Sequence, residues 1–160
     1  MKASQKVTVL ILAGIFCLST HSFGQMKHMD HIMVSPDTIK WMDGPPFFMP
    51  GMKLAVIEGD PSGTGMYTIR GKFPKKYKIM PHYHPTDEHV TVLKGKFYMG
   101  VGDKIDESKA SALPEGGYAN MMANTHHYAY TKKPCIVQVH GMGPFTITYI
   151  NPADDPRNKK

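Results

Sequence analysis

From Lys53 onward, hydrophobic positions come in short runs separated by Gly, Pro and Asp. The runs are rich in β-forming residues, and turn signals recur about every eight to twelve residues, which is typical of an all-β sandwich or barrel. No segment longer than ten residues keeps the i, i+3, i+4 spacing of an amphipathic helix. We therefore predict one all-β domain. The expected strand-like runs are 53–59, 65–73, 77–84, 88–95, 96–102, 118–123, 126–131, 135–141 and 145–150.

The first hydrophobic run, residues 7–18, differs from these because it is uncharged and follows a start that carries Lys2 and Lys6. Small residues, Ser22 and Gly24, precede Gln25. A charged start, a short apolar middle and small residues before a cut are typical of a secretory signal peptide. The run is also too short to span a bilayer comfortably. We predict a signal peptide over residues 1–24 and an exported protein, periplasmic or extracellular, with no stable membrane insertion after cleavage; an uncleaved anchor is the alternative.

Two flanking segments lack the strand pattern. Residues 25–52 join a Met- and His-rich start to a turn-rich stretch from Asp43 to Gly51, so we expect this segment to be loosely ordered. Its methionines and histidines either bind copper, since thioethers suit Cu(I), or belong to a tail that merely contains them. Residues 151–160 combine two prolines with charges of both signs and are expected to form a surface tail.

Charge and cysteine content exclude some classes of protein. The formal charge of +6 falls to +4 without the signal, that is 17 Lys and Arg minus 13 Asp and Glu. The lysines are scattered and there are only two arginines, whereas a nucleic-acid protein concentrates basic residues on one face. Without Cys17, Cys135 stands alone, so no internal disulfide forms. Cys135 begins an apolar run, and we expect a small buried hydrophobe there.

The candidate chemistry lies in residues 81–89, PHYHPTDEH. In a strand, His82 and His84 point to the same side. Glu88 shares a face with Val90 and Val92, and an ionised carboxylate facing a core needs a partner. A metal held with the two histidines supplies one, and this ligand set suits iron, manganese, nickel, zinc or copper. We expect the link 85–87 to turn the chain and bring the second strand beside the first; the alternative is a polar loop without metal.

Further polar residues recur at strand-like spacing in later runs. His126 and His127 are neighbours and face opposite ways, so at most one joins the cluster as a fourth ligand. Gln138 and His140 share a face of their run, and either point into the barrel or form a solvated face. Asp87 either hydrogen-bonds a ligand imidazole or caps a turn.

The spacing His82-x-His84-xxx-Glu88-xxxxxx-Gly95 resembles the first signature of the cupin superfamily. That signature has two histidines, a glutamate four residues later and a glycine seven residues further on. Its leading glycine is absent here, because Lys76 occupies that position.

A weaker match to the second cupin signature runs from Gly116 to His127. Met122 and Asn124 replace its usual proline and glycine. Asparagine adopts the left-handed conformation more readily than most residues, so the second replacement is tolerable.

The resemblance covers about residues 53–150 and implies a single-domain, double-sheet β-barrel related to the jelly roll. It implies one divalent transition metal held by His82, His84, Glu88 and His127, and a homodimer. It further implies a metal-dependent enzyme, dioxygenase- or isomerase-like, acting on an oxygen-bearing small molecule. Glu88 would be its catalytic group, by leaving the metal transiently or by accepting a proton. The alternatives are a module that binds a metal or small molecule without turnover, and a metal that only staples the barrel.

Overall fold

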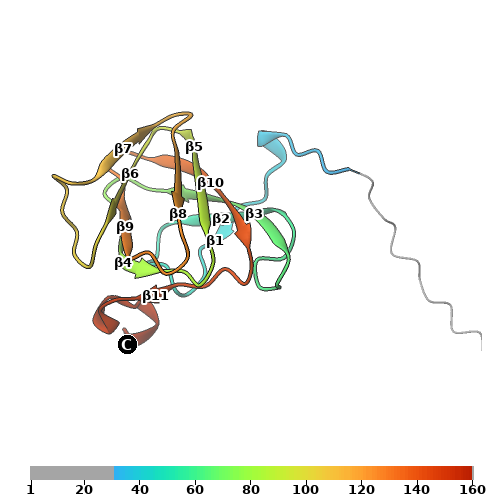
Figure 1. The fold of residues 1–160 in the computed structure, drawn as a ribbon. Helices are drawn as coiled ribbons and strands as arrows, with labels where there is room; N and C mark the ends of the chain where they lie inside the picture. The colour runs from blue at the N-terminus through green and yellow to red at the C-terminus, as the bar shows by residue number, and fades with distance from the viewer. Residues whose placement is uncertain (1–30, 160) are drawn as a thin grey trace, which may run out of the picture. The chain divides into compact units, whose positions relative to one another are not determined.

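Two antiparallel β-sheets form the fold in the computed structural model, which describes residues 31–159 (Figure 1). The strand order of the six-stranded sheet is β1 (Met42–Asp43), β2 (Lys53–Glu58), β3 (Met66–Phe73), β10 (Cys135–Met142), β5 (Glu88–Lys94) and β8 (Tyr118–Met121). The order of the five-stranded sheet is β11 (Thr148–Tyr149), β4 (Lys78–Tyr83), β9 (His127–Tyr130), β6 (Lys96–Val101) and β7 (Ser111–Pro114). The predicted all-β class is confirmed.

Helical structure in the described residues is limited to three short 3-10 turns, at Pro36–Thr38, Pro152–Asp154 and Pro156–Asn158. Two of these turns lie in the C-terminal tail, where most residues are exposed. Within residues 31–159, no helix has the length and hydrophobicity needed to cross a membrane. The predicted signal peptide lies outside the described residues.

The core lies between the sheets, and buried residues alternate with more exposed ones along β3, β5 and β10, whereas all four residues of β9 are buried. In β10, Cys135, Val137 and Val139 are buried, while Gln138 and His140 lie on the outer face. Alternation fixes the register, because a one-residue slip would exchange the two faces. Burial raises the pKa of the Cys135 thiol to about 11, so this residue is the small buried hydrophobe that its sequence context predicts.

The stretch before β2 also contributes to the core. Phe48 and Met52 are 8% and 2% exposed. Two tyrosine hydroxyls hold this stretch: Tyr77 donates to the carbonyl of Met49, and Tyr149 donates to the carbonyl of Phe47 at 2.7 Å. We expected loose order over residues 25–52, and within that segment Phe48 and Met52 instead pack into the domain because their apolar side chains cover the interior.

The link between the two halves of the histidine motif connects the sheets. β4 belongs to the five-stranded sheet and β5 to the six-stranded sheet. The expectation that β5 would lie beside β4 is therefore wrong, because both strands have an inner face that must be buried against the shared core. Glu88 consequently approaches the histidines from the opposite sheet.

Candidate metal centre

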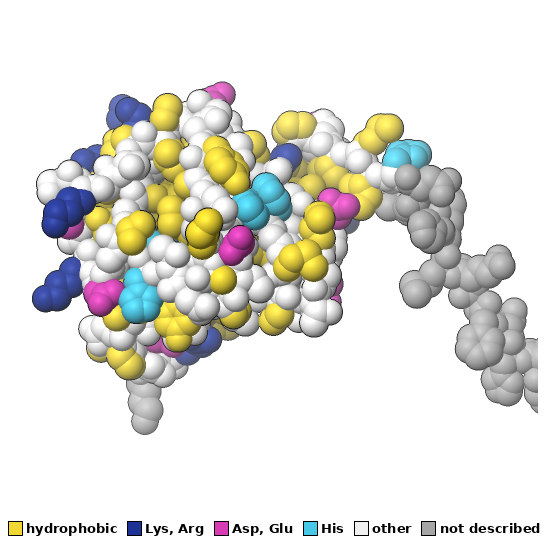
Figure 2. Space-filling view, in the orientation of Figure 1, with side chains coloured by type: hydrophobic (Ala, Val, Ile, Leu, Met, Phe, Trp, Pro, Cys, Tyr) yellow, Lys and Arg dark blue, Asp and Glu magenta, His cyan; other side chains and the backbone are white. Residues whose placement is uncertain are grey.

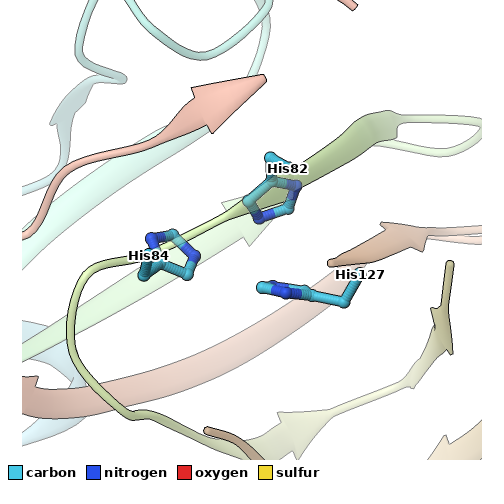
Figure 3. A group of neighbouring side chains, drawn as sticks. All are labelled: His82, His84 and His127. Carbon is cyan, nitrogen blue, oxygen red and sulfur yellow. The ribbon is translucent and has the colours of Figure 1, made fainter. Parts of the chain in front are cut away.

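Three buried histidines converge in the interior (Figure 3). His82 lies in β4 and pairs in register with His127 at the start of β9, and His84 follows β4 directly. One ring nitrogen of each lies within 4.8 Å of the others. Their exposures are only 3%, 4% and 1%. The grouping predicted for His82, His84 and His127 is thus present in the structure.

Each of these imidazoles contacts a backbone carbonyl through Nδ1. The contacts are His82 with Met80 at 2.7 Å, His84 with Thr146 at 2.5 Å and His127 with Thr125 at 2.8 Å. A carbonyl only accepts hydrogen bonds, so Nδ1 must carry the hydrogen in each ring. In the neutral ring, Nε2 then keeps a free lone pair, which is the form that ligates metals.

The Nε2 atoms of His84 and His127 are buried and have no hydrogen-bond partner among the described residues. Buried polar atoms without partners are rare in folded proteins and call for an explanation. Imidazole nitrogens suit divalent transition metals, so the three histidines could hold a metal ion. The donor set does not distinguish one such metal from another.

Glu88 lies against the same nitrogens. Its carboxylate oxygens are 3.6 Å from Nε2 of His84 and 3.4 Å from Nε2 of His127. Burial opposes its ionisation, but the nearby His84 and His127 favour the charged form more strongly, so the pKa of Glu88 is lowered to about 2. The carboxylate is therefore negative at neutral pH and placed to offset the charge of a cation.

Burial and neighbouring charge push two of the histidines in opposite directions. Burial, together with His127 and His84, lowers the pKa of His82 to about 3. Burial also opposes protonation of His127, but the Glu88 carboxylate favours it, and the net pKa of His127 is raised. His82 is thus a neutral imidazole, with the Nε2 lone pair free to bind a metal, over the whole physiological pH range.

Left-handed turns set the positions of these ligands. Asn124 has φ of +62°, and its N–H donates to the carbonyl of His84 at 2.8 Å. This bond ties the segment before His127 to the first half of the motif. Lys76, in place of the usual cupin glycine, also has positive φ, at +60°. Both residues have the left-handed backbone conformation that glycine adopts most readily, at some cost in strain for a residue with a Cβ.

The other polar residues of the motif region lie elsewhere. His126 faces away from the cluster and contacts Asp103 at 2.6 Å. Asp87 accepts a hydrogen bond from the N–H of Ala123 at 2.8 Å and caps that turn rather than contacting a ligand imidazole. Gln138 and His140 belong to the solvated face and not to the interior.

A narrow cavity of about 30 Å³ adjoins the site. Its polar lining residues are His82, Glu88 and His127, and the remainder of the described lining is hydrophobic. The volume accommodates a water molecule or a group of similar size, far less than the several hundred Å³ of a typical ligand pocket. A larger molecule would have to displace side chains of the lining.

Aromatic residues that the sequence did not single out enclose this cavity. Phe48 and Phe145 both line it. Phe145 stacks on His84, with ring centroids 5.3 Å apart and planes at 21°. The run 145–150 was predicted as a strand, but only Thr148 and Tyr149 form β11. The local sequence around Phe145 gives no sign that its ring covers His84, which is far away along the chain.

Neither a protein-family model nor a curated protein matches the sequence. Solved structures do match the fold. A proposed acetylacetone dioxygenase from Methylibium petroleiphilum is 20% identical, with 80% of this chain and 86% of that chain covered and a TM-score of 0.61. The polyketide cyclase RemF from Streptomyces resistomycificus is 14% identical, with 78% and 89% covered and a TM-score of 0.65.

An RmlC-like cupin from Shewanella frigidimarina is also similar. It is 15% identical, with 71% of this chain and 91% of that chain covered and a TM-score of 0.55. Likeness at these identities concerns the fold. The chain has the cupin fold, as its first histidine motif predicts.

Proposed function

We propose that this chain is an exported metal-dependent cupin enzyme that acts on an oxygen-bearing small molecule. His82, His84, Glu88 and His127 would hold one divalent transition metal, and the reaction would be dioxygenase- or isomerase-like. The observation that carries this proposal is the pair of buried, unpartnered Nε2 atoms of His84 and His127 beside the Glu88 carboxylate.

The chain's own groups have defined roles in this proposal. A bound metal would supply a Lewis-acidic position for an oxygen atom of the substrate. The backbone carbonyls hold the three rings with Nε2 available, and the apolar lining excludes bulk water. A carboxyl with a pKa of about 2 is a weak general base at neutral pH. The low pKa of Glu88, and its place beside Nε2 of His84 and His127, therefore support a metal-ligand role better than a proton-accepting role.

The reaction class rests on analogy. The proteins of similar fold include a proposed dioxygenase and a polyketide cyclase. One fold supports many chemistries, so the site and not the fold must decide. The site offers three imidazoles, one carboxylate and an apolar wall, which favours a small, uncharged substrate.

Elemental analysis of the mature protein, purified without an affinity tag, tests the site. We expect about one iron, manganese, nickel, copper or zinc per chain, lost in a His82→Ala/His84→Ala variant. His126→Ala is the matched control, because His126 adjoins a ligand but faces away; it should keep the metal. Retention of stoichiometric metal by the double variant would refute the assignment.

Export and assembly are separate parts of the proposal. Mass spectrometry of the secreted or periplasmic protein should find Gln25 as the first residue; a retained Met1 would contradict the signal peptide. Light scattering should give the mass of a homodimer, as single-domain cupins often form.

A non-catalytic binding module is the second candidate, favoured by the small cavity of about 30 Å³. Cobalt substitution separates the two. An open coordination position should let azide change the visible spectrum of the Co(II) protein, whereas a closed site leaves it unchanged. Oxygen consumption with small ketones and enols as substrates would then show turnover, and its absence despite an open position would favour the module.

A further inference from the structure

A second group of histidines lies on the outer face of the six-stranded sheet. His89 of β5 and His140 of β10 are paired directly across the strands. Their rings stack with centroids 4.9 Å apart and planes at 12°. Figure 2 shows a patch of histidine on the face where β5 and β10 lie, with hydrophobic side chains beside it. Alternation along β5 separates this pair from the buried cluster, since Glu88 points inward and His89 outward.

Two methionines complete this group. Met142 of β10 pairs directly with Met66 of β3. They are 50% and 65% exposed, so their thioethers are reachable from solvent. Both line a hollow of about 360 Å³ together with His89 and His140. We call this hollow, with Met66, His89, His140 and Met142 on its wall, the outer hollow. A methionine pair exposed beside a histidine pair is not accounted for by core packing.

The walls of the outer hollow are held by specific contacts. The Tyr118 hydroxyl lies 2.7 Å from Nδ1 of His89 and restrains that ring. The Thr86 hydroxyl donates to the carbonyl of Met142 at 2.8 Å, which ties the end of β10 to the link between β4 and β5. Asp87, at the same hollow, has one carboxylate oxygen engaged by the N–H of Ala123. The hollow is therefore part of the folded domain and not a feature of a loose tail.

We propose that the outer hollow binds Cu(I) through the thioethers of Met66 and Met142 and the imidazoles of His89 and His140. Thioether sulfur is a soft ligand that selects Cu(I), and imidazole also suits copper. The buried cluster contains nitrogen and oxygen donors only, so the two sites differ in the metal they prefer. This inference is independent of the proposed function, because it uses none of the buried ligands.

Competition against a chromophoric Cu(I) chelator under anaerobic conditions tests the inference. Met66→Leu/Met142→Leu keeps the side-chain volume and removes both sulfurs; we expect Cu(I) affinity to fall at least tenfold. Met42→Leu/Met122→Leu is the matched control. It also removes two exposed methionines, 54% and 68% exposed, but neither lines the outer hollow, and affinity should not change. Equal affinity of the two double variants would overturn the proposal.

Methyl NMR with Ag(I), a redox-inert analogue of Cu(I), locates the site directly in the full mature chain. We expect the labelled methyl signals of Met66 and Met142 to shift at the first equivalent of Ag(I). Shifts confined to Met26, Met29 and Met33 would instead place soft-metal binding in the N-terminal segment and refute the outer hollow. A His89→Ala/His140→Ala variant should weaken Ag(I) binding while the two methionines still respond, and unchanged affinity would remove the imidazoles from the site.

Discussion

Strand β5 carries two different histidine environments on its two faces. Inward, Glu88 contacts His84 and His127, which are buried and held through Nδ1 by backbone carbonyls. Outward, His89 stacks on His140 and contacts a tyrosine hydroxyl at a half-exposed surface. The same residue type thus serves two kinds of site. What separates them is burial, the partner of the second ring nitrogen, and the presence of a carboxylate inside and thioethers outside.

Neighbouring substitutions on β5 give the largest expected contrast. Glu88→Gln keeps the shape of the buried side chain but removes its negative charge. The affinity of the buried cluster for Zn²⁺ should therefore fall by about 100-fold or more, which is at least the upper end of the loss seen when a residue that only supports a metal ligand is removed. His89→Gln, one residue away on the other face, should leave it unchanged. Competition with a Zn²⁺ chelator measures both, and similar losses in the two variants would contradict the inward site.

Removing packing should also affect the two faces unequally. Phe48→Ala empties part of the wall around the cavity and should lower the free energy of unfolding by about 3–5 kcal/mol. Met142→Ala acts on a half-exposed outer position and should change it by no more than about 0.5 kcal/mol. Urea unfolding of both variants decides this, and a large loss with Met142→Ala would make the outer hollow a structural element.

The free energy of unfolding of the metal-free protein should depend on pH through the buried residues of the inner face. The pKa of His82 is about 3, below the ordinary 6.5, so the unfolded chain binds the proton first and stability falls as pH drops from 6.5 towards 3. Glu88, with a pKa of about 2 against 4.5, adds a loss below pH 4.5. His127, whose pKa is raised, acts in the opposite direction: its contribution is present below pH 6.5 and is lost as pH rises.

His82→Gln removes the first of these titrations. Its free energy of unfolding should therefore decline less than that of the wild type between pH 6.5 and 4. Denaturant unfolding at several pH values, after chelation of metal, provides the comparison. Equal declines in the two proteins would show that His82 is not held neutral by burial.

The smallest expected effect concerns the turn that joins the two halves of the inner site. Asn124 has positive φ, so Asn124→Ala should lower the free energy of unfolding by about 1 kcal/mol. Asn124→Gly should lie within about 0.5 kcal/mol of the wild type or above it, because glycine adopts this conformation without a steric penalty. Thermal unfolding of the pair tests this, and a harmless Asn124→Ala would show that the turn relaxes.

The sequence by itself determined most of the longer β-strands and the shared face of Glu88, Val90 and Val92. Period-two alternation puts Glu88 on the same inward face as Val90, and the spacing from His82 to Gly95 indicates the cupin fold. These features are local, because the direction of a side chain in a strand follows from its position in the run.

Only the tertiary structure decided which segments meet. It placed β4 and β5 in opposite sheets, stacked Phe145 on His84, put Phe48 in the cavity wall, and reduced the cavity to about 30 Å³. It also set His140 and Met66 beside His89 through the pairing of β10 with both neighbours. Such contacts join residues that are tens of positions apart in the sequence. The carbonyls that orient the imidazoles belong to the backbone, so no particular residue type marks them. Strand order and core packing determine these contacts, and a local sequence pattern shows neither the strand order nor the packing.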